Sequence, residues 1–128
     1  MTVRFAGYAA LFDRVDRGGD IVRRGAFAGT LGATDLPLLW QHRPDSRIGR
    51  IEHASEDRRG LRVIAALDPH AQEALQALRS GAATGLSFGY RVRRAHGRAP
   101  RELIALDLVE ISLVTLPMMP GAKVHMLG

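Results

Sequence analysis

The serine with the most distinctive surroundings is Ser87, in the run Gly85-Leu86-Ser87-Phe88-Gly89. Glycines near a serine let a second backbone or a bound molecule approach its hydroxyl closely. A serine hydroxyl attacks a carbonyl carbon only when a base, usually histidine, removes its proton and a third group orients that base. The chemistry to look for is therefore a serine, a histidine and an acid that come together from separate parts of the chain.

The same run matches the G-x-S-x-G pattern around the nucleophile of α/β-hydrolases. That pattern needs a strand before the serine and a helix after it, whereas residues 90–93 alternate as they do in a strand. We therefore reject the α/β-hydrolase fold. Two interpretations of Ser87 remain: a nucleophile on a strand, or a serine between glycines that serves packing alone.

Five histidines are candidates for the base, and His42 has the most suitable position. It ends the apolar strand predicted over residues 37–42 and precedes a loop at residues 43–45, and a rigid strand end beside a loop suits a functional site. The others are expected on a strand surface, at the start of a helix, in a turn and near the C-terminal end: His53, His70, His96 and His125. No two histidines lie within five positions of each other, so the sequence supports no metal site on one helix or hairpin.

The acid candidates lie in the apolar run of residues 107–114, where a charged side chain is costly unless it is paired. Alternation along a strand predicts two faces, with Asp107, Val109, Ile111 and Leu113 on one and Leu108, Glu110, Ser112 and Val114 on the other. A turn centred on Gly97 sets Ser87 opposite Asp107, and a shift of one or two residues sets it near Glu110. The sequence leaves this register open. A salt bridge to an arginine is the structural alternative for Glu110.

Short apolar runs between turn residues predict a β-rich domain that would position these side chains. Glycine makes up 14 of 128 residues, above the usual share of about 7%. Strands are expected over residues 4–13, 21–23, 37–42, 48–55, 61–67, 85–94 and 102–115, followed by an irregular loop at residues 117–121. The predicted architecture is a closed or half-closed, compact β-barrel of about seven short strands.

One segment has a strong helix signal. Asp68 is a suitable N-cap, Pro69 fits the first helical position and Gly81 fits the C-terminal stop. The apolar stripe comprises Ala71, Leu75, Leu78 and Ala82. A second, brief helix is expected over residues 25–31, so the fold class is mainly β with one or two helices (α+β).

Composition fits one globular domain over residues 1–128, with 46% hydrophobic and 24% charged residues. No apolar run reaches about 18 residues, so a transmembrane helix is not expected, and the N-terminal residues lack the apolar core and cleavage site of a signal peptide. The absence of cysteine excludes a disulfide and a thiol nucleophile. Lys and Arg number 18 against 13 Asp and Glu, and the resulting net charge of +5 suits nucleic acid, an acidic partner or simply a solvated surface.

Several short pieces, each unspecific alone, stand in a specific order: Gly7-Tyr8-Ala9-Ala10-Leu11-Phe12-Asp13, Gly19-Asp20-Ile21-Val22, Gly25-Ala26-Phe27, Leu39-Trp40-Gln41-His42, Ile48-Gly49-Arg50-Ile51, Gly85-Leu86-Ser87-Phe88-Gly89-Tyr90, Leu108-Val109-Glu110-Ile111-Ser112-Leu113-Val114, and residues 117–122. With these pieces in this order and spacing, the chain resembles the tailed-phage prohead proteases. These are capsid-maturation serine proteases related to the herpesvirus assemblins.

The resemblance implies a herpesvirus-protease-like β-barrel and a serine endopeptidase, with His42 as general base, Ser87 as nucleophile and Glu110 as the acid that orients the histidine. It implies no cofactor and no metal. The implied substrates are the scaffolding protein and the major capsid protein, cut inside the assembling prohead in the bacterial host cytoplasm. Self-association is expected and a membrane is not.

The competing hypothesis is a non-catalytic basic β-barrel module that binds capsid proteins or nucleic acid. Its support is the crowding of arginines on the last predicted hairpin: Arg91, Arg93, Arg94, Arg98 and Arg101. Phosphates attract such a cluster. The ordinary alternative is a solvated edge that discourages strand pairing.

Overall fold

The computed structural model describes residues 2–31 and 35–127, and within them the chain forms eight strands and one helix. In chain order these are β1 (Val3–Leu11), β2 (Asp20–Val22), β3 (Pro37–Trp40), β4 (Arg43–Glu56), β5 (Gly60–Leu67), α1 (Gln72–Ser80), β6 (Gly85–His96), β7 (Arg101–Val114) and β8 (Val124–Leu127). The predicted class, mainly β with few helices, is confirmed.

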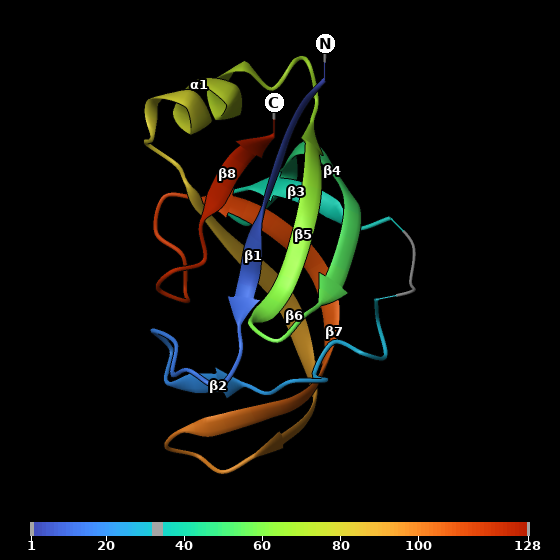
Figure 1. Ribbon diagram of the computed structural model, residues 1–128, viewed down its shortest axis with the longest axis vertical. Coiled ribbons are helices and arrows are strands. Elements are labelled where there is room, and N and C mark those ends of the chain that lie inside the picture. Colours follow the sequence, from blue (N-terminus) through green and yellow to red (C-terminus); the bar gives the residue numbers. More distant parts are fainter. Residues whose placement is uncertain (1, 32–34, 128) are drawn as a thin grey trace.

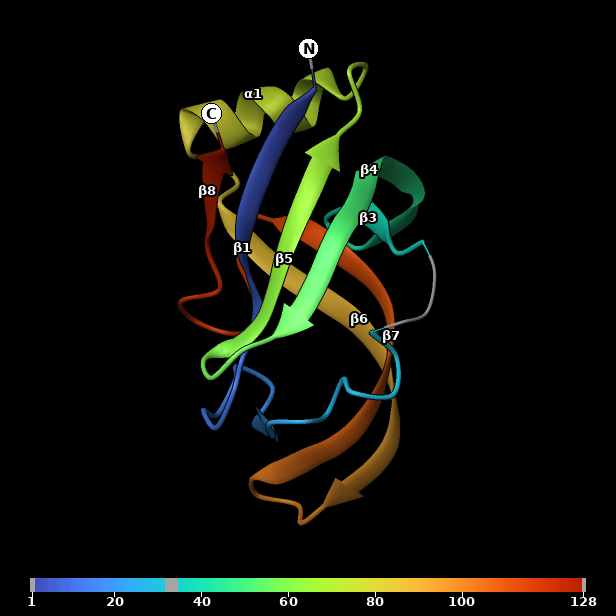
Figure 2. The same ribbon diagram turned by 45° about the vertical axis from the view of Figure 1, so that its right-hand side comes forward.

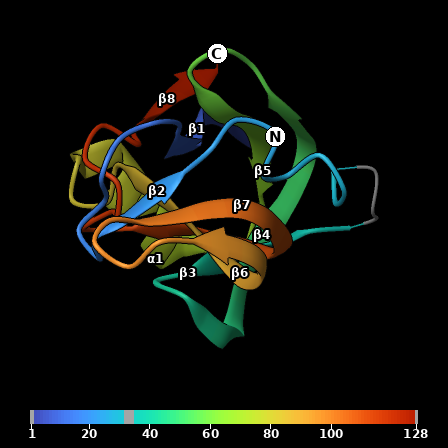
Figure 3. The same cartoon turned by 90° about the horizontal axis from the view of Figure 1, so that it is seen from below.

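The strands form one sheet that curls around the core, in the order β6-β7-β3-β4-β5-β1-β8, with the short β2 also on β7 (Figures 1 and 3). A bridge between Gly85 and Lys123 joins the start of β6 to the segment before β8. The N–H of Leu86 donates to the carbonyl of Ala122 at 2.9 Å beside it. The sheet therefore closes into a barrel at this end, and α1 lies across the same end (Figure 2).

The core contains side chains from all parts of the barrel. Its largest fully buried members are Phe5, Phe27, Leu38, Leu61, Leu86, Leu103, Leu106, Ile111 and Leu113. Strand β7 contributes four of these residues and pairs with β2, β3 and β6. It is therefore the central strand of this side of the barrel.

Hairpin β3–β4 turns at Gln41 and His42, where the predicted strand and loop boundaries were wrong. Both residues have positive φ, 51° and 60°, and Trp40 pairs with Arg43 across them. This is the backbone of a two-residue type I′ turn, which follows the twist of an antiparallel pair. His42 is thus a turn residue rather than a strand end, and the predicted loop at residues 43–45 is the start of β4. A non-glycine residue in this region costs about 1–3 kcal/mol and needs support from its surroundings.

Hairpin β6–β7 contains a bulge at Val109. Gly89 pairs with Glu110, whereas the next residue, Tyr90, pairs with Leu108. Val109 is therefore an extra residue on β7, and it interrupts the alternation of side chains between the two faces of the strand. Simple alternation predicts Val109 on the buried face, but its side chain is 44% exposed.

The bulge decides which residue faces Ser87. A regular ladder continued from the pairs below the bulge would set Ser87 opposite Ile111, which is fully buried in the core. With the extra residue, Ser87 pairs with Ser112 instead. Paired residues of neighbouring strands point to the same side of the sheet. The side chain of Ser87 is therefore on the opposite face from that of Ile111.

Helix α1 begins later than predicted. Asp68 does not cap it, because the Asp68 N–H donates to the carbonyl of Ile48 at 2.8 Å and holds this residue against β4. A turn follows, and Ala71 occupies the N-cap position without a side-chain hydrogen bond. Gly81 ends the helix with φ 80°, which confirms the predicted C-terminal stop.

Two further segments differ from prediction. Residues 25–31 form successive turns rather than a brief helix, because Gly25 has φ 89° and its N–H and that of Phe27 donate to the Glu56 carboxylate at 2.7 and 2.9 Å. Residues 124–127 form β8, which pairs with β1 where the sequence indicated only a tail. Gly7 permits this pairing, since a Cβ there would lie 2.3 Å from the carbonyl oxygen of Lys123.

The bulge predicts unequal costs for the same substitution at two positions on β7. Val114→Ala should lower the free energy of unfolding by about 1–3 kcal/mol, because Val114 is 3% exposed. Val109→Ala should lower it by less than about 0.5 kcal/mol. Chemical denaturation of both variants measures the difference, and equal losses would contradict the bulged register.

Candidate active site

The turn at His42 lies against β7, where two hydrogen bonds join it to the side chains of Glu110 and Ser112 and a third joins those two side chains to each other. Nδ1 of His42 is 2.5 Å from Oε1 of Glu110. The Ser112 hydroxyl donates to Oε2 of Glu110 at 2.6 Å and accepts the backbone N–H of His42 at 3.1 Å. His42, Glu110 and Ser112 therefore form one closed hydrogen-bonded cluster.

Ser87 lies beside this cluster. It pairs with Ser112 across the β6–β7 ladder, and directly paired side chains have Cβ atoms about 4.5–5.5 Å apart. Ser87 is 5% exposed. In the described part of the chain, neither its hydroxyl nor Nε2 of His42 has a hydrogen-bond partner. The ring nitrogen that is not bonded to Glu110 is thus unengaged among the described residues.

Burial differs between Glu110 and His42. The Glu110 side chain is 10% exposed, whereas that of His42 is 42% exposed. A buried carboxylate needs donors, and Glu110 has one on each oxygen. Because the imidazole opens to solvent, a ligand can reach it, whereas most of the Glu110 side chain is shielded from water.

Gly89 makes room for the Glu110 carboxylate. It pairs with Glu110, and a Cβ built on Gly89 would lie 2.6 Å from Oε1, 2.9 Å from Cγ and 3.0 Å from Cδ of that side chain. The second glycine of the G-x-S-x-G run thus has a physical role that the sequence did not indicate. The first glycine, Gly85, similarly leaves space for the ring of Pro117, because a Cβ added to Gly85 would lie 2.7 Å from Cδ of that ring.

Asp107, the other acid that the sequence left open, lies apart from His42. It pairs with Arg91, and its carboxylate is 3.7 Å from Nη1 of Arg93. The salt bridge to an arginine that was the alternative for Glu110 does not occur among the described residues, in which Glu110 pairs with His42. Of the two acids, the structure brings only Glu110 to the histidine.

The remaining histidines are exposed and lie away from the cluster: His53, His70, His96 and His125. Of these, His70 has an acidic neighbour, with Nε2 3.9 Å from the Asp68 carboxylate. Within residues 2–31 and 35–127, no group of three or more potential metal ligands gathers. In the same residues no helix is long and apolar enough to cross a membrane.

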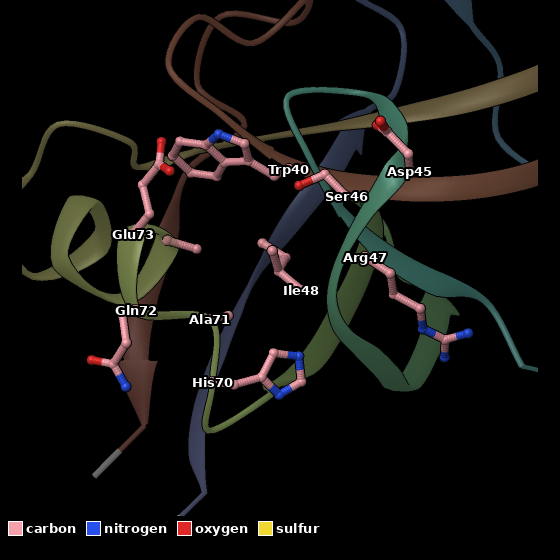
Figure 4. A pocket seen from close by; sticks show the side chains of 10 residues that line it. Trp40, Asp45, Ser46, Arg47, Ile48, His70, Ala71, Gln72 and Glu73 are labelled. Atoms are coloured by element: carbon pink, nitrogen blue, oxygen red, sulfur yellow. The ribbon is translucent and has the colours of Figure 1, made fainter.

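Two hollows flank the His42 turn. A cleft of about 410 Å³ adjoins His42 and Glu110 and has a largely apolar wall, formed by Pro37, Leu39, Pro44 and Val109, with Arg47 at its margin. A second hollow, of about 330 Å³, lies between hairpin β3–β4 and the start of α1 (Figure 4). Trp40 and Ile48 line it from the hairpin side, and none of His42, Ser87 and Glu110 lines it. The first hollow, which His42 and Glu110 line and Ser87 does not, is therefore the one from which a ligand would reach the cluster.

The arginine-rich tip of hairpin β6–β7 projects from the opposite end of the barrel to α1 (Figure 1). Part of its charge is neutralised locally, because Asp20 accepts two hydrogen bonds from Arg101, at 2.8 and 3.0 Å. The same carboxylate raises the pKa of Arg101. Arg93 is likewise close to Asp107. This region is distinct from the His42 cluster.

Solved herpesvirus proteases have the same fold. KSHV protease, in complex with a hexapeptide phosphonate inhibitor, matches with a TM-score of 0.73 and 13% identity over 100% of this chain and 66% of that chain. Varicella-zoster virus protease matches with a TM-score of 0.65 and 16% identity over 98% and 64%. The predicted herpesvirus-protease-like fold is confirmed.

The family follows from the sequence match. The chain belongs to the caudovirus prohead serine proteases, whose family model matches residues 1–127. It is 30% identical over 125 residues to the prohead protease of Enterobacteria phage HK97, covering 88% of this chain and 55% of that protein. It is also 30% identical over 94 residues to the capsid polyprotein of Pseudomonas phage PAJU2, covering 64% and 14%. The chain thus spans about half the length of the HK97 protease, and the predicted resemblance is confirmed.

Sequence reasoning did not find the contacts of Ser112. Alternation placed Ser112 on the same face as Glu110, but no role was assigned to it. A signal was available, since a serine two positions from an acid on one strand face lies within hydrogen-bond reach of it. The catalytic roles of His42, Ser87 and Glu110 stay predictions.

The close contact at Gly89 predicts that Gly89→Ala separates Glu110 from His42. The added Cβ would push the carboxylate away, so the low-field proton NMR signal of the His42 Nδ1–Glu110 bond should disappear or move upfield. Gly29→Ala is the control, because its Cβ would meet only the Arg93 guanidinium at 3.5 Å. An unchanged signal in Gly89→Ala would show that the cluster tolerates the methyl group.

Proposed function

We propose that this chain is a serine endopeptidase that cuts peptide bonds through Ser87, His42 and Glu110. The observation that carries the proposal is the 2.5 Å contact between Nδ1 of His42 and the buried Glu110 carboxylate, beside Ser87. A serine, a histidine and an oriented acid are the groups that acyl transfer needs, and their roles depend on geometry rather than on chain order. Membership of the prohead protease family supports the same reaction.

The hydrogen bonds support a separate task for each group in the proposed reaction. The Glu110 carboxylate accepts from Nδ1–H of His42, which leaves the lone pair of the ring on Nε2. Nε2 takes the proton of the Ser87 hydroxyl as its oxygen attacks the peptide carbonyl. The same nitrogen then returns the proton to the leaving amine. Glu110 keeps His42 in the tautomer with its proton on Nδ1, and it stabilises the imidazolium that exists between the two proton transfers.

The substrates that we propose are the scaffolding protein and the major capsid protein of the same virus, cut within the assembling prohead in the bacterial host. Family membership supports this class, and the match to the PAJU2 capsid polyprotein links a similar sequence to a capsid precursor. The cleft beside His42 has apolar walls, which suit an apolar side chain of the substrate. Self-association of the chain belongs to the same proposal.

Removal of the Ser87 hydroxyl should abolish cleavage. Ser87→Ala should lower turnover of the cognate capsid and scaffold proteins by about 10⁴-fold or more while the fold stays intact. A peptide phosphonate should label the original protein and not this variant, as read by mass spectrometry. The oligomeric state of each labelled sample is measured by sedimentation, because self-association is part of the proposal. Normal cleavage by Ser87→Ala would overturn the proposed function.

The two acids should differ in their effect on turnover. Glu110→Gln should lower kcat by about 10²–10⁴-fold, because the amide no longer stabilises the imidazolium, whereas Asp107→Asn should change it by less than about threefold. Asp107→Asn is the matched control, since both changes convert a carboxylate to an amide on β7. Peptide cleavage kinetics decide between them, and the reverse ranking would move the acid to Asp107.

A further inference from the structure

We propose that Ser112 is a positioning residue, which holds the Glu110 carboxylate and the backbone of His42 in the arrangement that the reaction requires. The inference rests on the proposed function for its kinetic consequence. It adds a fourth side chain, which does not touch the substrate, to the three that carry the chemistry.

The hydroxyl of Ser112 makes one hydrogen bond as a donor and one as an acceptor, both within the cluster. It donates its one proton to Oε2 of Glu110 at 2.6 Å and accepts the N–H of His42 at 3.1 Å. Because Ser112 is fully buried, a substrate carbonyl cannot reach its hydroxyl, so Ser112 is not a second nucleophile, although it lies directly opposite Ser87. Its full burial, at 0% exposure, keeps water from replacing either bond.

Ser112 determines where the carboxylate points. The Oε1 atom of Glu110 meets the imidazole, and the Oε2 atom has Ser112 as its donor. Without that hydroxyl, one oxygen of a buried carboxylate would lose its donor in a place where unsatisfied charge is costly. The side chain would then turn toward another donor or toward solvent, and its aim at Nδ1 of His42 would be lost.

Ser112 also supports the turn that presents the imidazole. His42 has φ 60°, a conformation that a non-glycine residue keeps only when its surroundings hold it. Bonds from β7 and from Thr115 just after it provide that support. They are the Ser112 contact, the bond from the Gln41 N–H to the carbonyl of Leu113 at 3.0 Å, and two bonds between the Gln41 amide and Thr115, at 2.7 and 3.1 Å. Of these bonds, the one to Ser112 reaches the backbone of His42 itself.

A double-mutant cycle with purified protein and a cleavable peptide tests this role. Ser112→Ala should lower kcat by about 10- to 100-fold and change KM by less than about twofold, the pattern of a lost orienting contact. In a Glu110→Ala background the same change should cost less than about threefold, because Ser112 acts through that acid. Equal fold losses in the two backgrounds would show a merely structural serine and overturn the proposal.

The controls separate positioning from general destabilisation. Ser112→Thr keeps the hydroxyl and should recover most of kcat, whereas Ser55→Ala, which removes a half-buried hydroxyl on β4 away from the site, should leave kcat unchanged. The melting temperature of each variant is measured alongside. An equal loss of kcat in Ser112→Thr and Ser112→Ala, at unchanged melting temperatures, would overturn the role of the hydroxyl.

A spectroscopic measurement tests the same role without any substrate. The low-field proton signal of the His42 Nδ1–Glu110 bond should be present in the original protein and lost or moved upfield in Ser112→Ala. An unchanged signal would overturn the proposal. Failure of the original protein to cleave peptide or react with a phosphonate would instead overturn the proposed function, and the NMR result would still decide whether Ser112 positions the cluster.

Discussion

The candidate site depends on the satisfaction of one buried carboxylate. Glu110 lies almost fully inside the protein, and each of its oxygens meets a donor, the imidazole of His42 on one side and the hydroxyl of Ser112 on the other. Removal of a carboxylate from water is costly unless such partners replace the lost hydration. The requirement therefore ties the turn after β3 to β7, and it explains why the residue opposite Glu110 is Gly89.

Strand β7 brings the separate parts of the site together. Leu39 of β3 and Ser87 of β6 pair with the same residue, Ser112, from its two sides. The extra residue at Val109 sets this row, because regular pairing would have aligned Ser87 with the core position Ile111. Bulges are common beside active sites for this reason: they change the direction of a side chain without breaking the sheet.

The barrel keeps the His42 cluster apart from the arginine-rich hairpin tip. The His42 cluster and its apolar cleft lie along β3, β4 and β7, whereas the arginine-rich hairpin tip projects from the end away from α1 (Figure 1). Two of the tip's arginines, Arg93 and Arg101, are near acidic side chains of the same chain. The charge that the composition indicates is thus partly used to hold β2 and β7 together, and it does not converge on the cluster.

The sequence by itself determined the mainly β class, the paired strands β4 and β5, the end of α1 at Gly81 and the family, because alternation, turn residues and the order of short motifs are local properties of the chain. It also singled out His42, Ser87 and Glu110. The tertiary structure alone showed that Glu110, and not Asp107, lies against His42, that His42 stands in a turn, and that Ser112 joins the cluster. The physical reason is that strand register and bulges depend on pairing between residues far apart in the chain, and one extra residue on β7 pairs Ser87 with Ser112 instead of the core residue Ile111.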